Sequence, residues 1–346
     1  MNKLKQGLCF DDVLLEPQYS KIKRRHEIDI GNKLSENIEL SLPIISSPMD
    51  TVTETSMAIS MYKEGGLGII HRYNSIEEQC ILVRKSFPGL IKVGAAIGVK
   101  VDYLERAQEL CEASARVICV DVAHGHHVLM KEALTALRKK LPSDLHIMAG
   151  NVATPNAFRD LANWGASSIK VGIGGGSICS TRIHTGHGVP TLQSILDCAI
   201  ESDVTGVKLI ADGGIKNSGD IVKALAAGAD FVMLGSLLAG TQETPGKIIS
   251  TPKEIGNGKM KVYRGMASKE AQKDWKGSVS SQEGVSTYVP YKGSAEDVLF
   301  DLQTGIRSGF SYSGANNLTE LQERVTFIQQ SNASCKESST HILDRK

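Results

Sequence analysis

Eight apolar, β-branched runs recur along the 346-residue chain, at spacings of mostly 23 to 29 residues. A segment with helical periodicity follows each run, for example at 103–111 and 220–228. Regular alternation of strand and helix favours a parallel sheet, and eight units favour a closed (β/α)8 TIM barrel. An open, doubly wound sheet is the alternative. The predicted strands begin at Leu42, Gly66, Ile91, Val117, Leu145, Ser168, Lys208 and Phe231.

Polar residues stand at the carboxyl ends of most of these predicted strands. In a barrel those ends meet at one mouth, where active sites lie, so we expect the side chains to converge. Taken singly, each could instead be a helix cap or a turn former. The residues are Ser46, Ser47, Asp50, His71, Arg72, Asp121, His124, Asn151, Ser177, Cys179, Asp212, Gly235 and Ser236.

The segment 171–182, VGIGGGSICSTR, follows the sixth predicted strand. Glycine N–H groups in such a turn can face an anion such as phosphate. The thiol of Cys179, with the hydroxyl of Thr181 close by, is a candidate nucleophile. Arg182 or the N–H groups of the loop are expected to stabilise its thiolate. The alternative is a flexible glycine-rich loop that contains a cysteine by chance.

Two further glycine turns, 211–214 and 234–236, follow the last two predicted strands. Barrels often bind phosphate in these two loops. Together with Ser177 they predict a cup for a 5′-nucleotide, with its base near Cys179 and its ribose hydroxyls on Asp212. No GxGxxG turn opens a βαβ unit, so no Rossmann domain is indicated, and a dinucleotide would have to bind at the same mouth.

We expect a single barrel domain over residues 1–346. The segment of about 240–293 after the eighth strand is too long for a plain connection and predicts a mobile flap. The residues from about 331 to 346 are predicted to form a polar C-terminal tail.

Composition argues against several classes of protein. The 39 basic and 38 acidic residues give a net charge of +1 without a basic stripe, so no nucleic-acid partner is expected. No apolar run reaches the ~18 residues of a membrane span, so no membrane partner is expected either. The seven scattered cysteines and the polar N-terminus fit a reducing, cytoplasmic setting.

Several motifs together resemble the inosine monophosphate dehydrogenase/guanosine monophosphate reductase family. The resemblance covers nearly the whole chain and implies a (β/α)8 barrel that is usually a homotetramer. The motifs are FDDVLL at 10–15, SPMDTV at 47–52, GLGIIH at 66–71, GNVAT at 150–154, the glycine loop at 172–182, ADGG at 211–214 and YRGM at 263–266.

The resemblance also implies roles for single residues. Cys179 would attack purine C2, and Thr181 and Glu283 would be the other catalytic residues. The carbonyls of Gly174, Gly176 and Cys179 would bind a monovalent cation, K⁺. Contacts to GMP or IMP are implied for Ser47, Ser177, Asp212, Gly214, Gly235, Ser236, Tyr263, Gly265 and Met266, and contacts to the nicotinamide cofactor for Arg72, Asp121 and Asn151.

Within the family, three features favour a GMP reductase that uses NADPH. The chain is short, and it lacks the paired regulatory module that dehydrogenases usually insert after strand 2. Between Tyr263 and Val289 it also lacks the Arg-Tyr pair with which dehydrogenases activate a water.

Other features resemble the dehydrogenases and keep an IMP dehydrogenase without the module as an alternative. These are the segment 47–49, the ending 335–338, and Arg72 in place of the usual reductase lysine. A non-catalytic nucleotide-binding barrel and an unrelated aldolase-type barrel are further alternatives. For an aldolase, Lys170 is the best Schiff-base candidate, although it lies in mid-strand.

Overall fold

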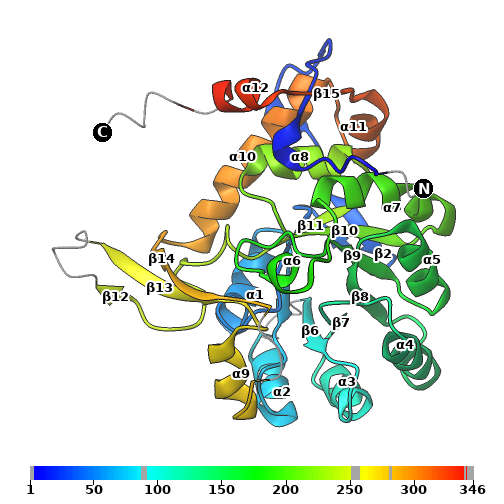
Figure 1. Cartoon of the computed structure of the whole chain (residues 1–346), viewed down its shortest axis with the longest axis vertical. Helices are drawn as coiled ribbons and strands as arrows, with labels where there is room; N and C mark the ends of the chain where they lie inside the picture. Colours follow the sequence, from blue (N-terminus) through cyan, green and yellow to red (C-terminus); the bar gives the residue numbers. More distant parts are fainter. Residues whose placement is uncertain (1–3, 87–91, 251–257, 280–282, 339, 341–346) are drawn as a thin grey trace.

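The computed structural model describes residues 4–86, 92–250, 258–279, 283–338 and 340. Eight parallel strands form a closed barrel in the order β10-β11-β4-β5-β6-β7-β8-β9 (Figure 1), which confirms the predicted (β/α)8 barrel. All eight predicted strands are present, although the predicted start at Ile91 lies outside the described residues. The strands are β4 Ile44–Ser46, β5 Leu67–Ile70, β6 Val93–Ile97, β7 Val117–Asp121, β8 His146–Val152, β9 Ser168–Val171, β10 Lys208–Asp212 and β11 Phe231–Leu234.

Helices follow the barrel strands, and local signals mark where several of them begin. At α2 the Ser75 hydroxyl accepts the Glu78 N–H, while the Glu78 carboxylate accepts the Ser75 N–H. No helix in the described ranges is long and apolar enough to cross a bilayer. The helices around the barrel are α1 Thr55–Lys63, α2 Ile76–Lys85, α3 Tyr103–Glu112, α4 Val128–Lys140, α5 Pro155–Asn163, α7 Thr191–Thr205, α8 Ser218–Ala226 and α10 Ala295–Ser313.

A hairpin that the sequence did not predict packs against the barrel interior. It consists of β2 (Asn32–Ser35) and β3 (Ile38–Leu40), which pair antiparallel. Its apolar side chains join the same buried cluster as interior residues of the barrel strands, such as Phe231. The hairpin therefore covers apolar side chains inside the barrel that would otherwise face water. Its members in that cluster are Leu34, Ile38 and Leu40.

The two ends of the chain meet in a second unpredicted pairing. β1 (Val13–Leu15) pairs antiparallel with β15 (Phe327–Gln329). The predicted polar tail begins with a short helix, α12 (Asn332–Glu337), while 339 and 341–346 lie outside the described residues. The remaining short elements of the terminal regions are η1 Phe10–Asp12, η2 Arg25–Glu27 and α11 Leu318–Arg324.

The segment after the eighth strand has secondary structure of its own. Its described residues form a three-stranded antiparallel sheet and one helix, and Figure 1 shows the strands projecting from the barrel. The buried ammonium of Lys261 donates to the carbonyls of Thr241 and Thr244, which ties the sheet to the end of the barrel. We keep the name flap for residues 240–293. Its elements are β12 Ile249–Ser250, β13 Lys259–Arg264, α9 Lys269–Lys276 and β14 Ser286–Pro290.

His146, at the start of β8, is buried without a charge partner. It is 2% exposed, and its Nε2 lies 2.8 Å from the Ser168 hydroxyl. Burial, together with the nearby cation of Arg138, lowers the pKa of His146 to about 3. The folded protein therefore keeps this imidazole neutral at pH values where the unfolded chain would protonate it.

We expect acid to destabilise the protein through His146. The stability that its neutral form contributes is fully present above about pH 6.5 and is lost as the pH falls toward 3, at about 1.4 kcal/mol per pH unit. Urea unfolding at pH 7 and pH 5 should show that His146→Gln loses roughly 2 kcal/mol less than wild type. His26→Gln, at an exposed position, is the control and should behave as wild type. Equal losses in all three proteins would contradict this account of His146.

Candidate active site

A cavity of about 410 Å³ opens at the carboxyl ends of the barrel strands. Every residue to which the family resemblance gives a role contributes to its lining, so the predicted convergence is confirmed for them. Their individual roles remain predictions. The residues are Ser47, Arg72, Asp121, Asn151, Gly174, Gly176, Ser177, Cys179, Thr181, Asp212, Gly214, Gly235, Ser236, Tyr263, Gly265, Met266 and Glu283.

The three predicted catalytic side chains form a hydrogen-bonded chain. The Cys179 thiol donates to the Thr181 hydroxyl over 3.2 Å, and that hydroxyl donates to Glu283 Oε2 over 2.8 Å. The backbone holds this arrangement, because Ser180 N–H donates to the Glu283 carbonyl and Val285 N–H donates to the Ile178 carbonyl, each over 3.0 Å. A thiol, a hydroxyl and a carboxylate are thus placed for proton exchange.

Arg182 does not take the place expected for it beside the thiol. It lies in the short helix α6 (Thr181–Thr185), and its guanidinium donates to the carbonyls of Val189 (2.6 Å) and Ile173 (3.2 Å). Arg182 therefore connects the start of the glycine-rich loop to Val189, shortly before α7. The N–H groups of that loop remain the candidates for stabilising a thiolate at Cys179.

Glycines allow close backbone approaches in the predicted phosphate cup, which is formed by the loop 171–182 and the turns 211–214 and 234–236. Gly213 has a φ of +97°, and a Cβ there would lie 3.1 Å from the backbone nitrogen of Gly176. A Cβ on Gly235 would lie 2.9 Å from the Tyr263 hydroxyl, which itself lies 3.5 Å from the Ser177 hydroxyl. Burial raises the pKa of Tyr263 to about 12, so this hydroxyl stays protonated at neutral pH and can donate to an anion. The cup offers the donors that a phosphate needs.

The floor of the cavity carries a buried cation, Lys170, for which the sequence suggested only a Schiff-base role in the aldolase alternative. Lys170 is 2% exposed and forms ion pairs with Asp121 and with Asp212, whose Oδ2 lies 3.4 Å from Nζ. Asn151 Nδ2 donates to the same Asp212 oxygen over 2.9 Å. Burial alone would lower the pKa of Lys170, but the two carboxylates outweigh it and raise that pKa above its usual range. A charged, ion-paired amine cannot form a Schiff base, which disfavours an aldolase.

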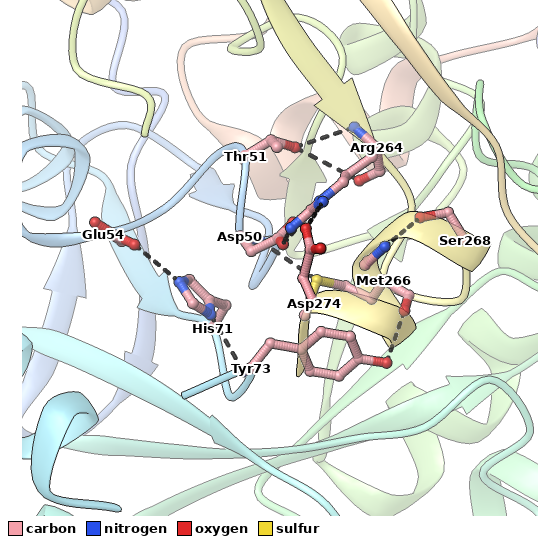
Figure 2. A network of polar contacts seen from close by, with 10 residues as sticks. Asp50, Thr51, Glu54, His71, Tyr73, Arg264, Met266, Ser268 and Asp274 are labelled. Atoms are coloured by element: carbon pink, nitrogen blue, oxygen red, sulfur yellow. Dashed lines mark hydrogen bonds and ion pairs between the residues drawn. The ribbon is translucent and has the colours of Figure 1, made fainter. Parts of the chain in front are cut away.

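Four polar strand-end residues do not line the cavity, and three of them contact other groups. Ser46 Oγ lies 2.8 Å from Thr53 Oγ1. His71 contacts Glu54 over 3.1 Å, and Asp50 pairs with Arg264 (Figure 2). Their convergence on the cavity was wrongly predicted, since position at a strand end does not fix where a side chain points. The four residues are Ser46, Asp50, His71 and His124.

Arg72 does line the cavity, at the position where reductases usually have a lysine. Its guanidinium lies 5.5 Å from the centroid of the Tyr73 ring, within the range of a cation–π contact. Arginine retains the positive charge of lysine, but it is a poor proton donor. At this position the cavity therefore has a fixed cation.

Removing the Lys170 charge should destabilise the fold strongly. Lys170→Met leaves two partly buried carboxylates without their cation, which should cost roughly 3–5 kcal/mol in the free energy of unfolding. Urea unfolding at pH 7 measures this. Lys208→Met is the matched control, because its partly exposed ion pair with Asp230 should contribute less than about 1 kcal/mol. A loss in Lys170→Met no larger than in the control would refute the role of the buried cation.

Comparison with known proteins identifies relatives along the whole chain. The family model of the IMP dehydrogenase / GMP reductase domain matches residues 7–341. The chain is 35% identical to inosine-5′-monophosphate dehydrogenase of Nitrosopumilus maritimus, over 98% of this chain and 99% of that protein. It is 33% identical to GMP reductase of Leishmania major, over 99% and 98%.

The structural comparison agrees with the sequence comparison. A crystal structure of a cysteine-to-alanine variant of GMP reductase from Trypanosoma brucei, in complex with guanosine 5′-monophosphate, superposes with a TM-score of 0.91 at 32% identity, covering 98% of both chains. The alignment with the Leishmania reductase spans 487 positions against 346 residues here, so a reductase too can carry sequence that this chain lacks. Chain length does not separate the two activities. The chain belongs to the IMP dehydrogenase/GMP reductase family of oxidoreductases.

Proposed function

We propose that this protein is a GMP reductase that catalyses GMP + NADPH + H⁺ → IMP + NH₃ + NADP⁺. The observation that carries the proposal is the hydrogen-bonded chain from Cys179 through Thr181 to Glu283 within the cavity. The reaction breaks the bond between C2 and the amino group of the purine. It therefore needs a nucleophile for C2 and a proton source for the departing nitrogen, and this chain of side chains provides both.

The covalent step follows from the chemistry of the thiol. Cys179 Sγ attacks purine C2, a carbon–sulfur bond forms, and the C2–N bond breaks as the amino group leaves as ammonia. Thr181 and Glu283 hold the proton that the leaving nitrogen requires. A bound nicotinamide cofactor would supply the hydride that C2 receives, and breakage of the carbon–sulfur bond would then release IMP and the thiolate.

The proposed binding groups match the chemistry of the two ligands. The cup of Ser177, Gly214, Gly235, Ser236 and Tyr263 offers hydrogen-bond donors to the phosphate. Asp212 would accept from the ribose hydroxyls, while the purine base would contact Gly265 and Met266, with Ser47 nearby.

On the other side of the floor, Arg72, Asp121 and Asn151 would hold the nicotinamide cofactor. A carboxylate and a carboxamide suit the amide of a nicotinamide, because they accept and donate hydrogen bonds. The preference for NADPH over NADH and the homotetramer are adopted from the family.

A K⁺ ion on the carbonyls of Gly174, Gly176 and Cys179 is part of the same proposal. Backbone carbonyls are oxygen ligands of the kind that K⁺ takes. The loop is already drawn into a tight turn here, since Cys179 N–H donates to the Gly176 carbonyl over 3.1 Å. A cation at this point would hold the carbonyls beside the thiol in one arrangement.

The flap supports the reductase over the dehydrogenase. A dehydrogenase must activate a water to hydrolyse its adduct, and the family's dehydrogenases use an Arg-Tyr pair for that step. Arg264 is the one arginine between Tyr263 and Val289, and it is ion-paired to Asp50 and Asp274 (Figure 2). Tyr288 lies in β14 and is 57% exposed.

Absorbance at 340 nm, measured in both directions, tests the proposed reaction. GMP with NADPH should lose absorbance and release ammonia, while IMP with NAD⁺ should give no XMP. A gain of absorbance with IMP and NAD⁺, together with XMP, would make the protein an IMP dehydrogenase. No reaction in either direction would favour a non-catalytic nucleotide-binding barrel.

Cys179→Ala should abolish turnover and leave GMP binding largely intact. Turnover near wild type in this variant would refute the covalent scheme.

Glu283→Gln should slow deamination far more than it weakens nucleotide binding. It removes the acid–base group of the chain while keeping its shape, so we expect kcat to fall by about 10²–10⁴ with little change in the Kd of GMP. Steady-state kinetics and calorimetry measure the two effects. Glu270→Gln, an exposed carboxylate on α9, is the control and should behave as wild type. Equal losses in kcat and binding would instead make Glu283 a binding residue.

A further inference from the structure

Tyr73, in the loop after β5, contacts a part of the flap that lines the cavity. Its hydroxyl donates to the carbonyl of Met266 over 2.6 Å (Figure 2). The two residues are 193 positions apart in the sequence, and both line the cavity. Burial raises the pKa of Tyr73, so the hydroxyl stays protonated at neutral pH and acts as the donor.

The ring of Tyr73 is itself held by two neighbours. Trp275 of α9 stacks with it, with ring centroids 6.1 Å apart and an angle of 17° between the ring planes. The guanidinium of Arg72 lies 5.5 Å from the same ring. A tyrosine restrained in this way offers its hydroxyl in one direction.

The chain just before Met266 is anchored to a different loop. Arg264 pairs with Asp50 and with Asp274, and its N–H donates to the Thr51 hydroxyl over 3.2 Å. Figure 2 shows these contacts on one side of Met266 and Tyr73 on the other. The segment 264–266 is thus held between the loop after β4 and the loop after β5.

Holding the Met266 carbonyl also fixes the peptide group that it belongs to. A trans peptide is planar, so the direction of the carbonyl sets the direction of the Ala267 N–H on the opposite side. Both residues line the cavity. The Met266 carbonyl already accepts from Tyr73, so the group that this peptide can offer to a ligand is the Ala267 N–H, and O6 of a 6-oxopurine is an acceptor for such a donor.

We propose that Tyr73 is a positioning residue that orients the Met266 peptide group for recognition of a 6-oxopurine base. The inference rests on the proposed function for the nucleotide, but it does not depend on which reaction follows, because both GMP and IMP carry a 6-oxopurine. Tyr73 acts through Met266 and contributes to the affinity for the base rather than for the phosphate or ribose.

The test is Tyr73→Phe, which removes the hydroxyl and keeps the ring between its neighbours. Calorimetry should show affinities for IMP and GMP about 5-fold weaker than in wild type, the value of one neutral hydrogen bond. Binding of ribose 5-phosphate, which has no base, should be unchanged. Tyr312→Phe is the matched control: Tyr312 also lies beside an arginine, Arg25, but on the exposed face of α10, and its loss should change none of the three affinities.

Three results would overturn the proposal. Wild-type affinity of Tyr73→Phe for IMP and GMP would show that the hydroxyl does not orient the base site. An equal loss for IMP, GMP and ribose 5-phosphate would show that Tyr73 supports the fold of the whole cavity instead. If the wild-type protein binds ribose 5-phosphate but neither nucleotide, the proposed function fails first, and the positioning role fails with it.

Discussion

The cavity depends on one buried charge and on the groups that neutralise it. Lys170 lies in β9, yet its ammonium contacts Asp121 at the end of β7 and Asp212 at the end of β10, and Asn151 of β8 donates to the latter. Burying a cation costs much free energy unless it is paired, and here the two carboxylates provide the pairing. These contacts connect the ends of four successive strands, β7 to β10, at the floor of the cavity. They give the loops above the floor a rigid base.

Much of the barrel could be predicted because each of its strands has a local signature. Runs such as VICV at 117–120 are apolar throughout, as expected of strands covered on both faces. The hairpin 32–40 and the pairing of β1 with β15 could not be predicted in this way, since strands of three or four residues are too short to show a clear periodicity in the sequence. The site shows the same contrast. Motif residues at strand ends could be expected to converge, whereas the contact of Tyr73 with Met266, 193 residues away, becomes visible only in the folded structure.

The predictions for Arg182 and His71 were wrong because residues close in sequence, or at a strand end, need not be close in space. Arg182 is three residues from Cys179, but α6 turns its side chain toward the carbonyls of Ile173 and Val189. His71 stands at a strand end, but its ring faces Glu54. Lys170 lies in mid-strand, and a lysine in an otherwise apolar run is rarely buried unless it is paired, so the sequence did carry a signal for its carboxylate partners.

The order of pairing in the barrel has a consequence for synthesis on the ribosome. β4 is the first barrel strand to emerge, but one of its two neighbours is β11, which ends at Leu234. Until β11 has left the exit tunnel, one edge of β4 has no backbone partner. The apolar barrel interior that the β2–β3 hairpin covers also stays exposed to water. A nascent chain of this fold therefore exposes an unpaired strand edge for most of its translation. Such an edge can bind chaperones, and it can also pair with another chain and begin aggregation.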